Sequence, residues 1–181
     1  MSIHIPTPKI HKLTQADLQL IRSFVKTNTQ DLPEGFFSSY PTPESIDNNN
    51  VFGIFSDGNL ASIAQAKFGE NMTSTDEMLE PVLPHGVKKT QIAELGGWLT
   101  GYDYRGHGLL RTLVQHSKES IKDTRTSALT FCHIANAVAN AFAQSGICGD
   151  LVKGDFDFFG DTFNIYREDF TREEETHSLT L

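Results

Sequence analysis

The chain carries hydrophobic residues at the spacing of amphipathic helices in several segments. In residues 14–26 they recur every three or four positions, and this periodicity predicts a helix. Thr14, followed three residues later by Asp17, is a typical start signal for it. Its apolar face would consist of Leu18, Ile21, Phe24 and Val25. A second helix is expected from Gly108, with Leu109, Leu110, Leu113, Val114 and Ile121 facing inward.

Other segments have the continuous or alternating apolar pattern of β-strands. Residues 51–68 predict a hairpin with its turn at Asp57-Gly58-Asn59. Residues 5–13 predict a short edge strand, because Pro6 and Pro8 cannot donate to a strand ladder. Further strands are expected within 90–100, 127–134, 147–152 and 161–168.

The remaining segments complete the order of elements. A third helix is expected over residues 135–146, ending at Gly146. Residues 30–50 are interrupted by prolines and asparagines and leave room for a short helix only. Residues 69–89, which are polar and contain two prolines, are expected to form an exposed loop. Strands and helices alternate only in the second half, which predicts an α/β (α+β) protein with helices on both faces of a mixed sheet.

Length and composition indicate a globular protein. The 181 residues, 38% hydrophobic and 21% charged, suffice for one domain with a sizeable core. We expect this domain over residues 1–170 and a frayed tail over 171–181. No apolar run has the length of a transmembrane helix, and the N-terminus lacks the apolar stretch of a signal peptide. The sequence therefore predicts a cytoplasmic protein that has no membrane partner.

The formal net charge of −8 bears on the expected partners. Lysines and arginines are scattered, so no nucleic-acid partner is expected, and acidity favours a positively charged small substrate. The seven histidines show no helical pair with carboxylates, so no metal site is expected. Cys132 and Cys148 lie in apolar surroundings and are expected to be buried thiols, with a disulfide or a catalytic pair as the minority alternative.

The segment "GYDYRGHGLL", residues 101–110, joins a strand to a helix. The first turn of a helix has unpaired N–H groups and a partial positive charge. Gly106 and Gly108 would let the backbone approach an anion, and Arg105 would add a cation. The glycines are not followed by Lys-Ser/Thr, and Arg111 stands where the third glycine of a dinucleotide fingerprint would fall. On pattern alone, a phosphate-binding turn and a plain tight connection are equal alternatives.

Residues 92–147 resemble the acyl-CoA-binding region of the GNAT superfamily of N-acetyltransferases. In that family a strand leads into Arg/Gln-x-x-Gly-x-Gly/Ala and a helix. The matching residues are Arg105, Gly106, His107, Gly108, Leu109 and Leu110, with Leu110 replacing the last small residue. The segment "SALTFCHIANAVANAFAQSGI" is similar to the family's next strand and helix, and the order of elements fits over most of the chain. The resemblance implies a GNAT-like, mostly antiparallel sheet of six to seven strands with about four helices on both faces.

The resemblance also implies acetyl-CoA as the cosubstrate. The amides around Arg105–Leu110 would hold its pyrophosphate. The strand edge at Trp98, Leu99 and Thr100 would pair with the pantetheine arm, and its amides would polarise the thioester carbonyl. Asn136, which follows the position where the family often has asparagine, is included in this expected cofactor site.

Amine acetylation needs a base for the amine and benefits from an acid for the leaving thiolate. The resemblance implies Glu94 as the base, and a carboxylate within an apolar strand would bind a proton near neutral pH, which suits this role. The alternative is that Glu94 is exposed at a strand edge or paired with a nearby cation. The family's acidic tyrosine corresponds to Phe142, which cannot donate a proton. The other donors are Tyr104, taken as the first candidate, and Cys132, His133 and Tyr166; alternatively, the thiolate leaves without an acid.

The segment "GDFDFFGD" alternates aspartates with phenylalanines over residues 154–161. One interpretation is a binding wall for an amine, through charge and cation–π attraction. The favoured interpretation is a hairpin in which core phenylalanines alternate with solvated aspartates.

The sequence therefore predicts an acyltransferase, acting by direct attack of a primary amine of a small molecule or peptide on the thioester of acetyl-CoA. The alternatives are a catalytically silent acyl-CoA-binding or interaction module on the same fold, and a transferase for a longer acyl group. A ping-pong route through Cys132 has little support. Dimers are common in the family, so a homodimer remains open.

Overall fold

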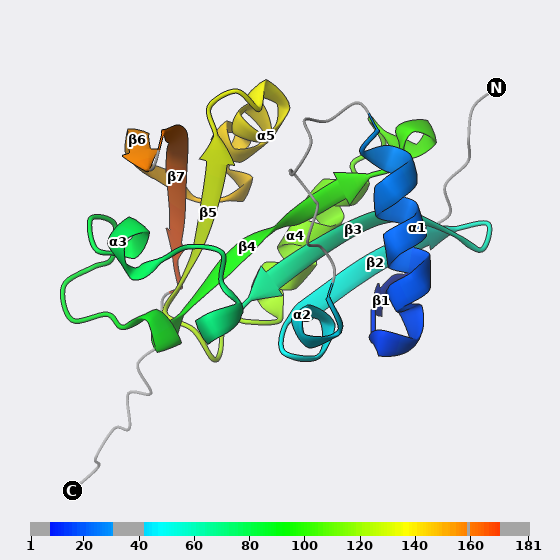
Figure 1. Cartoon of the computed structure of the whole chain (residues 1–181), viewed down its shortest axis with the longest axis horizontal. Helices are drawn as coiled ribbons and strands as arrows, with labels where there is room; N and C mark the ends of the chain where they lie inside the picture. The colour runs from blue at the N-terminus through cyan, green and yellow to red at the C-terminus, as the bar shows by residue number, and fades with distance from the viewer. Residues whose placement is uncertain (1–7, 31–41, 159, 171–181) are drawn as a thin grey trace, which may run out of the picture.

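The computed structural model describes residues 8–30, 42–158 and 160–170, which form one seven-stranded sheet in the order β1-β2-β3-β4-β5-β7-β6 (Figure 1). The strands are β1 (Ile10–Lys12), β2 (Asn50–Ser56), β3 (Asn59–Lys67), β4 (Ile92–Thr100), β5 (Ser127–His133), β6 (Asp150–Phe158) and β7 (Asp161–Asp169). Neighbours are antiparallel except β4 and β5, which are parallel. The expected mixed, mostly antiparallel sheet is confirmed, whereas the tail expected at 171–181 lies outside the described residues.

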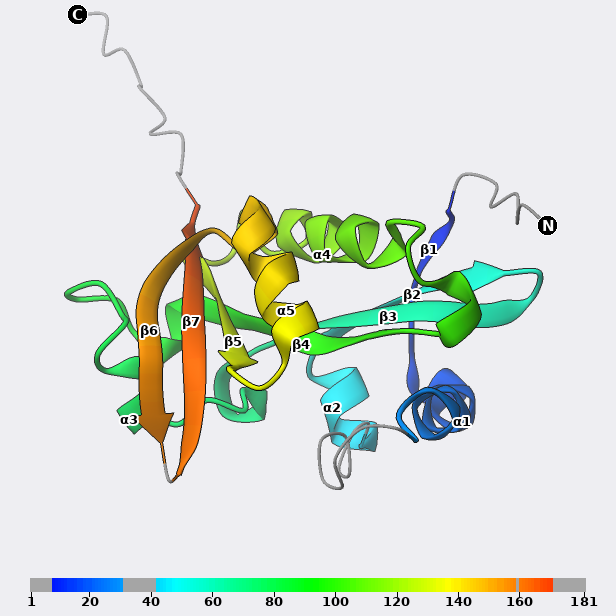
Figure 2. The same ribbon diagram turned by 90° about the horizontal axis from the view of Figure 1, so that it is seen from above.

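Helices cover both faces of the sheet, as expected. They are α1 (Leu18–Asn28), α2 (Pro43–Asp47), α3 (Asp76–Leu79), α4 (Leu109–Glu119) and α5 (Ala137–Phe142). Shorter helical turns occur at Gln15–Asp17, Gly69–Asn71, Lys89–Gln91, Tyr102–Tyr104 and Ala143–Ile147. Figure 2 shows α4 and α5 on one face of the sheet and α1 and α2 on the other. Among the described helices, none combines the length and the apolarity needed to span a bilayer.

Alternation along β3 explains how one strand serves two cores. Ile63 faces α1, where it packs with residues such as Phe24 and Leu99. Its neighbour Ala64 faces α4, where it packs with Leu113. Successive strand residues point to opposite faces, so a strand covered on both sides is apolar throughout. This is why β3 is buried along almost its whole length.

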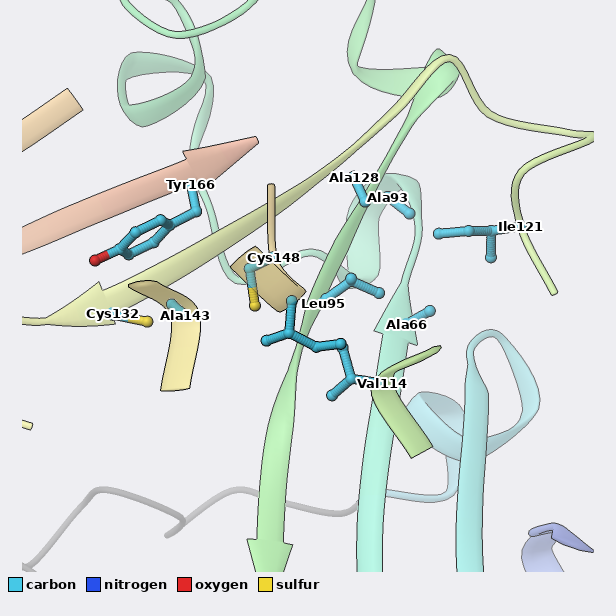
Figure 3. Packing of buried hydrophobic residues seen from close by; sticks show 11 residues of the cluster. Ala66, Ala93, Leu95, Val114, Ile121, Ala128, Cys132, Ala143, Cys148 and Tyr166 are labelled. Atoms are coloured by element: carbon cyan, nitrogen blue, oxygen red, sulfur yellow. The ribbon is translucent and has the colours of Figure 1, made fainter. Parts of the chain in front are cut away.

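A third core lies where β4, β5 and β7 meet α4 and the turn after α5 (Figure 3). Leu95, Val114 and Tyr166 pack there around Cys132 and Cys148. Both cysteines are buried and free, which confirms the expectation of buried thiols.

The sheet divides at the parallel pair. β4 and β5 are in register only over Ile92–Glu94 and Ser127–Leu129. Beyond this point β4 continues beside β3, and β5 continues beside β7, so the two strands diverge (Figure 1). Residues 95–100 of β4 consequently have no strand partner on that side within the described residues.

A β-bulge sits in the diverging part of β4. Between Gly96 and Leu99, β4 has one residue more than the facing stretch of β3 between Gln65 and Ile63. Gly97 lies in this bulge with φ +59°, a conformation that favours glycine. The extra residue bends β4 and changes which way its backbone groups point.

The structure contradicts the sequence expectation for residues 69–89 and confirms the one for residues 154–161. Residues 69–89 are not an exposed loop: Met72, Leu79 and Val82 are buried against β4, β5 and β7. These apolar residues are irregularly spaced along the segment, so the sequence carried no periodic signal of a helix or a strand. The favoured hairpin interpretation of residues 154–161 is confirmed. β6 extends to Phe158, and Phe156 packs against the buried cluster of Met72, Leu79 and Val82 while the neighbouring aspartates are exposed.

We expect the fold to tolerate the replacement of Gly149 less well than that of Gly86. Gly149 has φ +81°, and a Cβ there would lie 2.1 Å from the Arg167 carbonyl oxygen on β7. Gly86 has the same φ with nothing within 4 Å. We expect Gly86→Ala to cost about 1–2 kcal/mol of unfolding free energy from backbone strain alone, and Gly149→Ala to cost several kcal/mol because backbone must also move. Thermal unfolding followed by circular dichroism measures both, and equal losses would contradict this account.

Candidate functional site

The loop before α4 has the backbone form of an anion cradle. Gly106 has φ +81°, and Gly108, the N-cap of α4, has φ +76°. A Cβ at either position would meet no atom within 4 Å, so the backbone conformation, rather than crowding, requires glycine. Arg105 through Gly108 are all exposed. The loop that leads to the first-turn amides of α4 is therefore exposed to solvent, and it has no side chain at Gly106 and Gly108.

Two arginines flank this cradle. Arg105 donates from Nε to the Thr100 carbonyl oxygen at 3.3 Å, and its guanidinium stacks on the Tyr102 ring at 4.1 Å. Arg111, in the first turn of α4, donates to Ser145 Oγ at 2.9 Å. The first turn contains no acidic residue. The helix start is thus a locally positive place on a protein of net charge −8, which favours an anion.

The rest of the expected cofactor site lies along the free edge of β4 and across the split. Leu99 is buried towards α1, and Thr100 Oγ1 lies 2.8 Å from Ser62 Oγ. Trp98 points to the opposite face, where its ring meets Phe142 of α5 edge-on at 5.4 Å. Phe142, at the position expected for the acid, therefore contacts Trp98 on the strand edge that is expected to bind pantetheine.

Three other members of the expected site have structural contacts. Leu109 is buried, and Leu110 packs against the cores beneath α4, so its side chain is turned away from the exposed loop. Asn136 caps α5 by accepting a hydrogen bond from the Ala139 amide at 2.9 Å. His107 is exposed in the cradle.

Glu94 occupies the fork of the sheet. It is the last residue of β4 in register with β5, and it is only 5% exposed. Its Oε1 lies 3.0 Å from Lys67 Nζ, and its Oε2 accepts from the Ser74 amide at 2.8 Å and from Ser74 Oγ at 2.9 Å. Lys67 also donates to Thr73 Oγ1. The strand around Glu94 is apolar, as expected, but its carboxylate is bonded to polar groups, and the alternative of a nearby cation is the one that the structure contains.

Sequence reasoning missed Lys67 and Ser74. Lys67 is the cross-strand partner of Glu94 in the β3–β4 register. The hairpin predicted over 51–68 contained this lysine, but the long connection to β4 left the register of the two strands open. Ser74 lies within the segment expected to be exposed, and only the fold shows that it is buried against Glu94.

The four candidate proton donors lie in different surroundings. Tyr104 is partly buried with Trp98 and Leu110 beneath α4. His133 accepts the Ala135 amide at Nδ1 (3.1 Å) and has Nε2 3.3 Å from Asp161 Oδ1, so both ring nitrogens have partners. Tyr166 is 2% exposed, and burial raises the pKa of its hydroxyl, with the nearby Gln144 side chain opposing this in part.

Cys132, the fourth candidate, is a poor nucleophile or acid. Burial, helped by the neighbouring Cys148, raises the pKa of Cys132 to about 12. Burial likewise raises the pKa of Cys148 to about 11, against the lowering influence of Thr130 and Lys118. The thiolate is the reactive form of cysteine, so these thiols are inert at neutral pH. Within the described ranges, His, Cys, Asp and Glu side chains form no group of three or more that could hold a metal ion.

Comparison with known proteins gives matches among solved structures. No family model and no curated protein matches the sequence. The PaiA N-acetyltransferase of Thermoplasma acidophilum, solved with coenzyme A, aligns with a TM-score of 0.64 at 14% identity over 90% of this chain and 100% of its own. The ribosomal-protein-S18-alanine N-acetyltransferase of Escherichia coli aligns at 0.63 and 15% identity over 94% and 98%. A GNAT-family acetyltransferase of Streptococcus pneumoniae aligns at 0.64 and 12% identity over 91% and 99%. The chain has the GNAT fold, as the sequence resemblance implied.

The buried thiols should make the protein less stable at alkaline pH. Both folded-state pKa values lie above the ordinary cysteine value, so below about pH 8.5 the thiols are protonated in both states and contribute no pH dependence. Above it the unfolded chain releases these protons first, and the free energy of unfolding falls by up to about 1.4 kcal/mol per pH unit for each thiol until the folded-state values are reached.

Urea unfolding between pH 8 and 10.5 measures this slope. The doubly substituted Cys132→Ala, Cys148→Ala protein should lose stability less steeply than the wild type, because it lacks the two thiols whose protons the folded state retains. Parallel slopes, or rapid labelling of the native thiols by a disulfide reagent at pH 7.5, would contradict the assigned burial.

Proposed function

We propose that the protein is an acetyl-CoA-dependent N-acetyltransferase acting on a primary amine of a small molecule or peptide. The observation that carries the proposal is the arrangement around the fork in the sheet. A glycine cradle at the start of α4, a free edge of β4 and the carboxylate of Glu94 follow one another along one strand and its exit loop. The fold neighbours support acetyl transfer, and one of them is described as a complex with coenzyme A.

The residues present fit the CoA moiety. Pyrophosphate would be bound by the amides of residues 105–110, where the positive φ of Gly106 and Gly108 keeps the backbone open and the flanking arginines supply charge. The pantetheine amides would pair with the free edge of β4 at Trp98, Leu99 and Thr100. When bound, the cosubstrate supplies an activated acetyl thioester.

This chain's own groups would then divide the chemistry. The bulge at Gly97 redirects amides of β4 into the split, where an N–H can polarise the thioester carbonyl. Glu94, which lies beside Lys67 and Ser74, would take the proton that the amine loses as its nitrogen bonds to the carbonyl carbon. The C–S bond breaks, and the thiolate gains a proton from Tyr104, which shares the cluster beneath α4 with Trp98.

A silent acyl-CoA-binding module is the second candidate, and two observations favour it. The sequence resemblance puts Phe142 at the position of the family's acid, and Glu94 has hydrogen-bond partners on both oxygens. Binding without turnover would identify this second function.

Binding at the cradle is the first prediction of the proposal. Acetyl-CoA should raise the melting temperature, because a ligand that binds only the folded state stabilises it. Gly106→Val should weaken that binding about tenfold or more by forcing the loop out of its positive φ and covering the amides.

Gly86→Val is the matched control, since Gly86 also has φ +81° with nothing within 4 Å of a Cβ there, and it lies in the connection before β4. It should lose similar folding stability and keep wild-type affinity in isothermal titration calorimetry. Equal loss of affinity in both variants would refute the cradle.

Turnover is the second prediction. Thiol release from acetyl-CoA should depend on a primary amine, measured against an amine panel with a thiol-reactive dye. Glu94→Gln should lower kcat/KM by about 10²–10⁴-fold, the usual contribution of a general base, and leave the affinity for CoA unchanged.

The pH–rate profile gives the control for this second prediction. The acidic limb of kcat/KM should disappear in Glu94→Gln. An unchanged profile would remove Glu94 as the base, and the absence of amine-dependent thiol release in the wild type, together with CoA binding, would favour the silent module.

A further inference from the structure

We infer that Lys67 is a positioning residue that holds the Glu94 carboxylate in place through a buried ion pair. The functional part of this inference rests on the proposed function, since Glu94 acts there as the base. The structural part, a coupling between the Lys67 ammonium and the Glu94 carboxylate, is independent of any reaction.

The contact geometry couples these two side chains closely. Lys67 on β3 and Glu94 on β4 are direct partners in the antiparallel register. Their charged atoms lie 3.0 Å apart, and the side chains are only 16% and 6% exposed. At this low exposure, water screens the pair far less than it screens a surface ion pair. The lysine therefore has a strong influence on whether the carboxyl group binds a proton.

Among the described groups around the Glu94 carboxylate, the Lys67 ammonium is the one that carries a charge. From the segment after β3, Ser74 donates two neutral hydrogen bonds to Oε2. From β5, the facing residue is Leu129, and on its own strand Ile92 is two residues away on the same face. Among the described residues, Lys67 is the charged side chain in contact with the carboxylate, whereas Lys89 of the same connection pairs with Asp76 in the open.

The cluster keeps capacity for a ligand that donates hydrogen bonds. Oε1 of Glu94 accepts from Lys67 and has a further lone pair. A Cβ at Gly96 would lie in van der Waals contact with Lys67 Nζ, at 3.9 Å. Gln65, the strand partner of Gly96, is 1% exposed and its amide oxygen has no hydrogen-bond partner. An amine brings N–H donors that match these two oxygen acceptors.

A buried ion pair is poorly explained by stability. Desolvation offsets much of its attraction, and apolar residues of similar size at such places are often as stable or more so. The arrangement does provide what a general base needs, a carboxylate held in one orientation. Lys67 acts through Glu94 in this account and contacts no reacting atom.

The experiment compares Lys67→Met with Lys67→Arg. Losing the cation should move the acidic limb of the pH–kcat/KM profile to higher pH by about one unit or more, with activity partly regained at alkaline pH. Arginine keeps the charge and should restore the wild-type limb. Lys89→Met breaks the exposed pair with Asp76 and should leave the limb where it is. A lower kcat with an unmoved limb in Lys67→Met would overturn the inference.

A direct titration separates this inference from the proposed function. In protein labelled with ¹³C at glutamate carboxyl groups, the Glu94 resonance is the one absent from Glu94→Gln. It should change over a higher pH range in Lys67→Met than in the wild type, whether or not the protein turns over any amine. The same pH range in both proteins would overturn the inference. An inactive wild type with a shifted resonance would refute only the proposed function.

Discussion

The short parallel pairing of β4 and β5 is the constraint on which the candidate site depends. Only three residues of each strand are in register before the two diverge. Had the pairing continued, the amides and carbonyls of β4 from Leu95 onward that point away from β3 would be hydrogen-bonded to β5. Because it stops at Glu94, a strand edge opens in the middle of the protein rather than at its rim. The bulge at Gly97 and the exit into the cradle then place further backbone donors beside the same opening.

The opening has chemically different sides. On the face of the sheet opposite α4, buried polar groups gather around Glu94, Lys67 and Gln65. Towards α4 and α5, the boundary is the contact of Trp98 with Phe142. Alternation along β4, shifted by one position at the bulge, sends these side chains to opposite faces. In the proposed function, an amine on the polar side would meet a carboxylate, and an acyl chain on the other side would meet aromatic rings.

Patterns within single segments predicted most of the fold, and relations between distant segments were beyond them. The positive φ values at Asp57 and Gly58 match the turn that the hairpin pattern predicted. The cradle was recognisable because its chemistry is local to a loop and a helix start. The partners of Glu94 depend on the β3–β4 register and on a connection of more than twenty residues, whose irregular apolar residues carry no period. The split itself has no local signal, since β4 and β5 read as ordinary apolar strands.

The apolar side of the opening bears on the leaving group. In the proposed function, a thiolate released beside Trp98 and Phe142 would face aromatic rings instead of water, and burial without partners disfavours the charged form. The sequence resemblance puts the family's acidic tyrosine at Phe142, whose ring has no proton to donate there. Cys132 and Tyr166 hold their protons tightly in the adjoining core, and His133 has partners on both nitrogens. Tyr104, which is partly buried and borders the exposed cradle, is the remaining candidate for the proton donor.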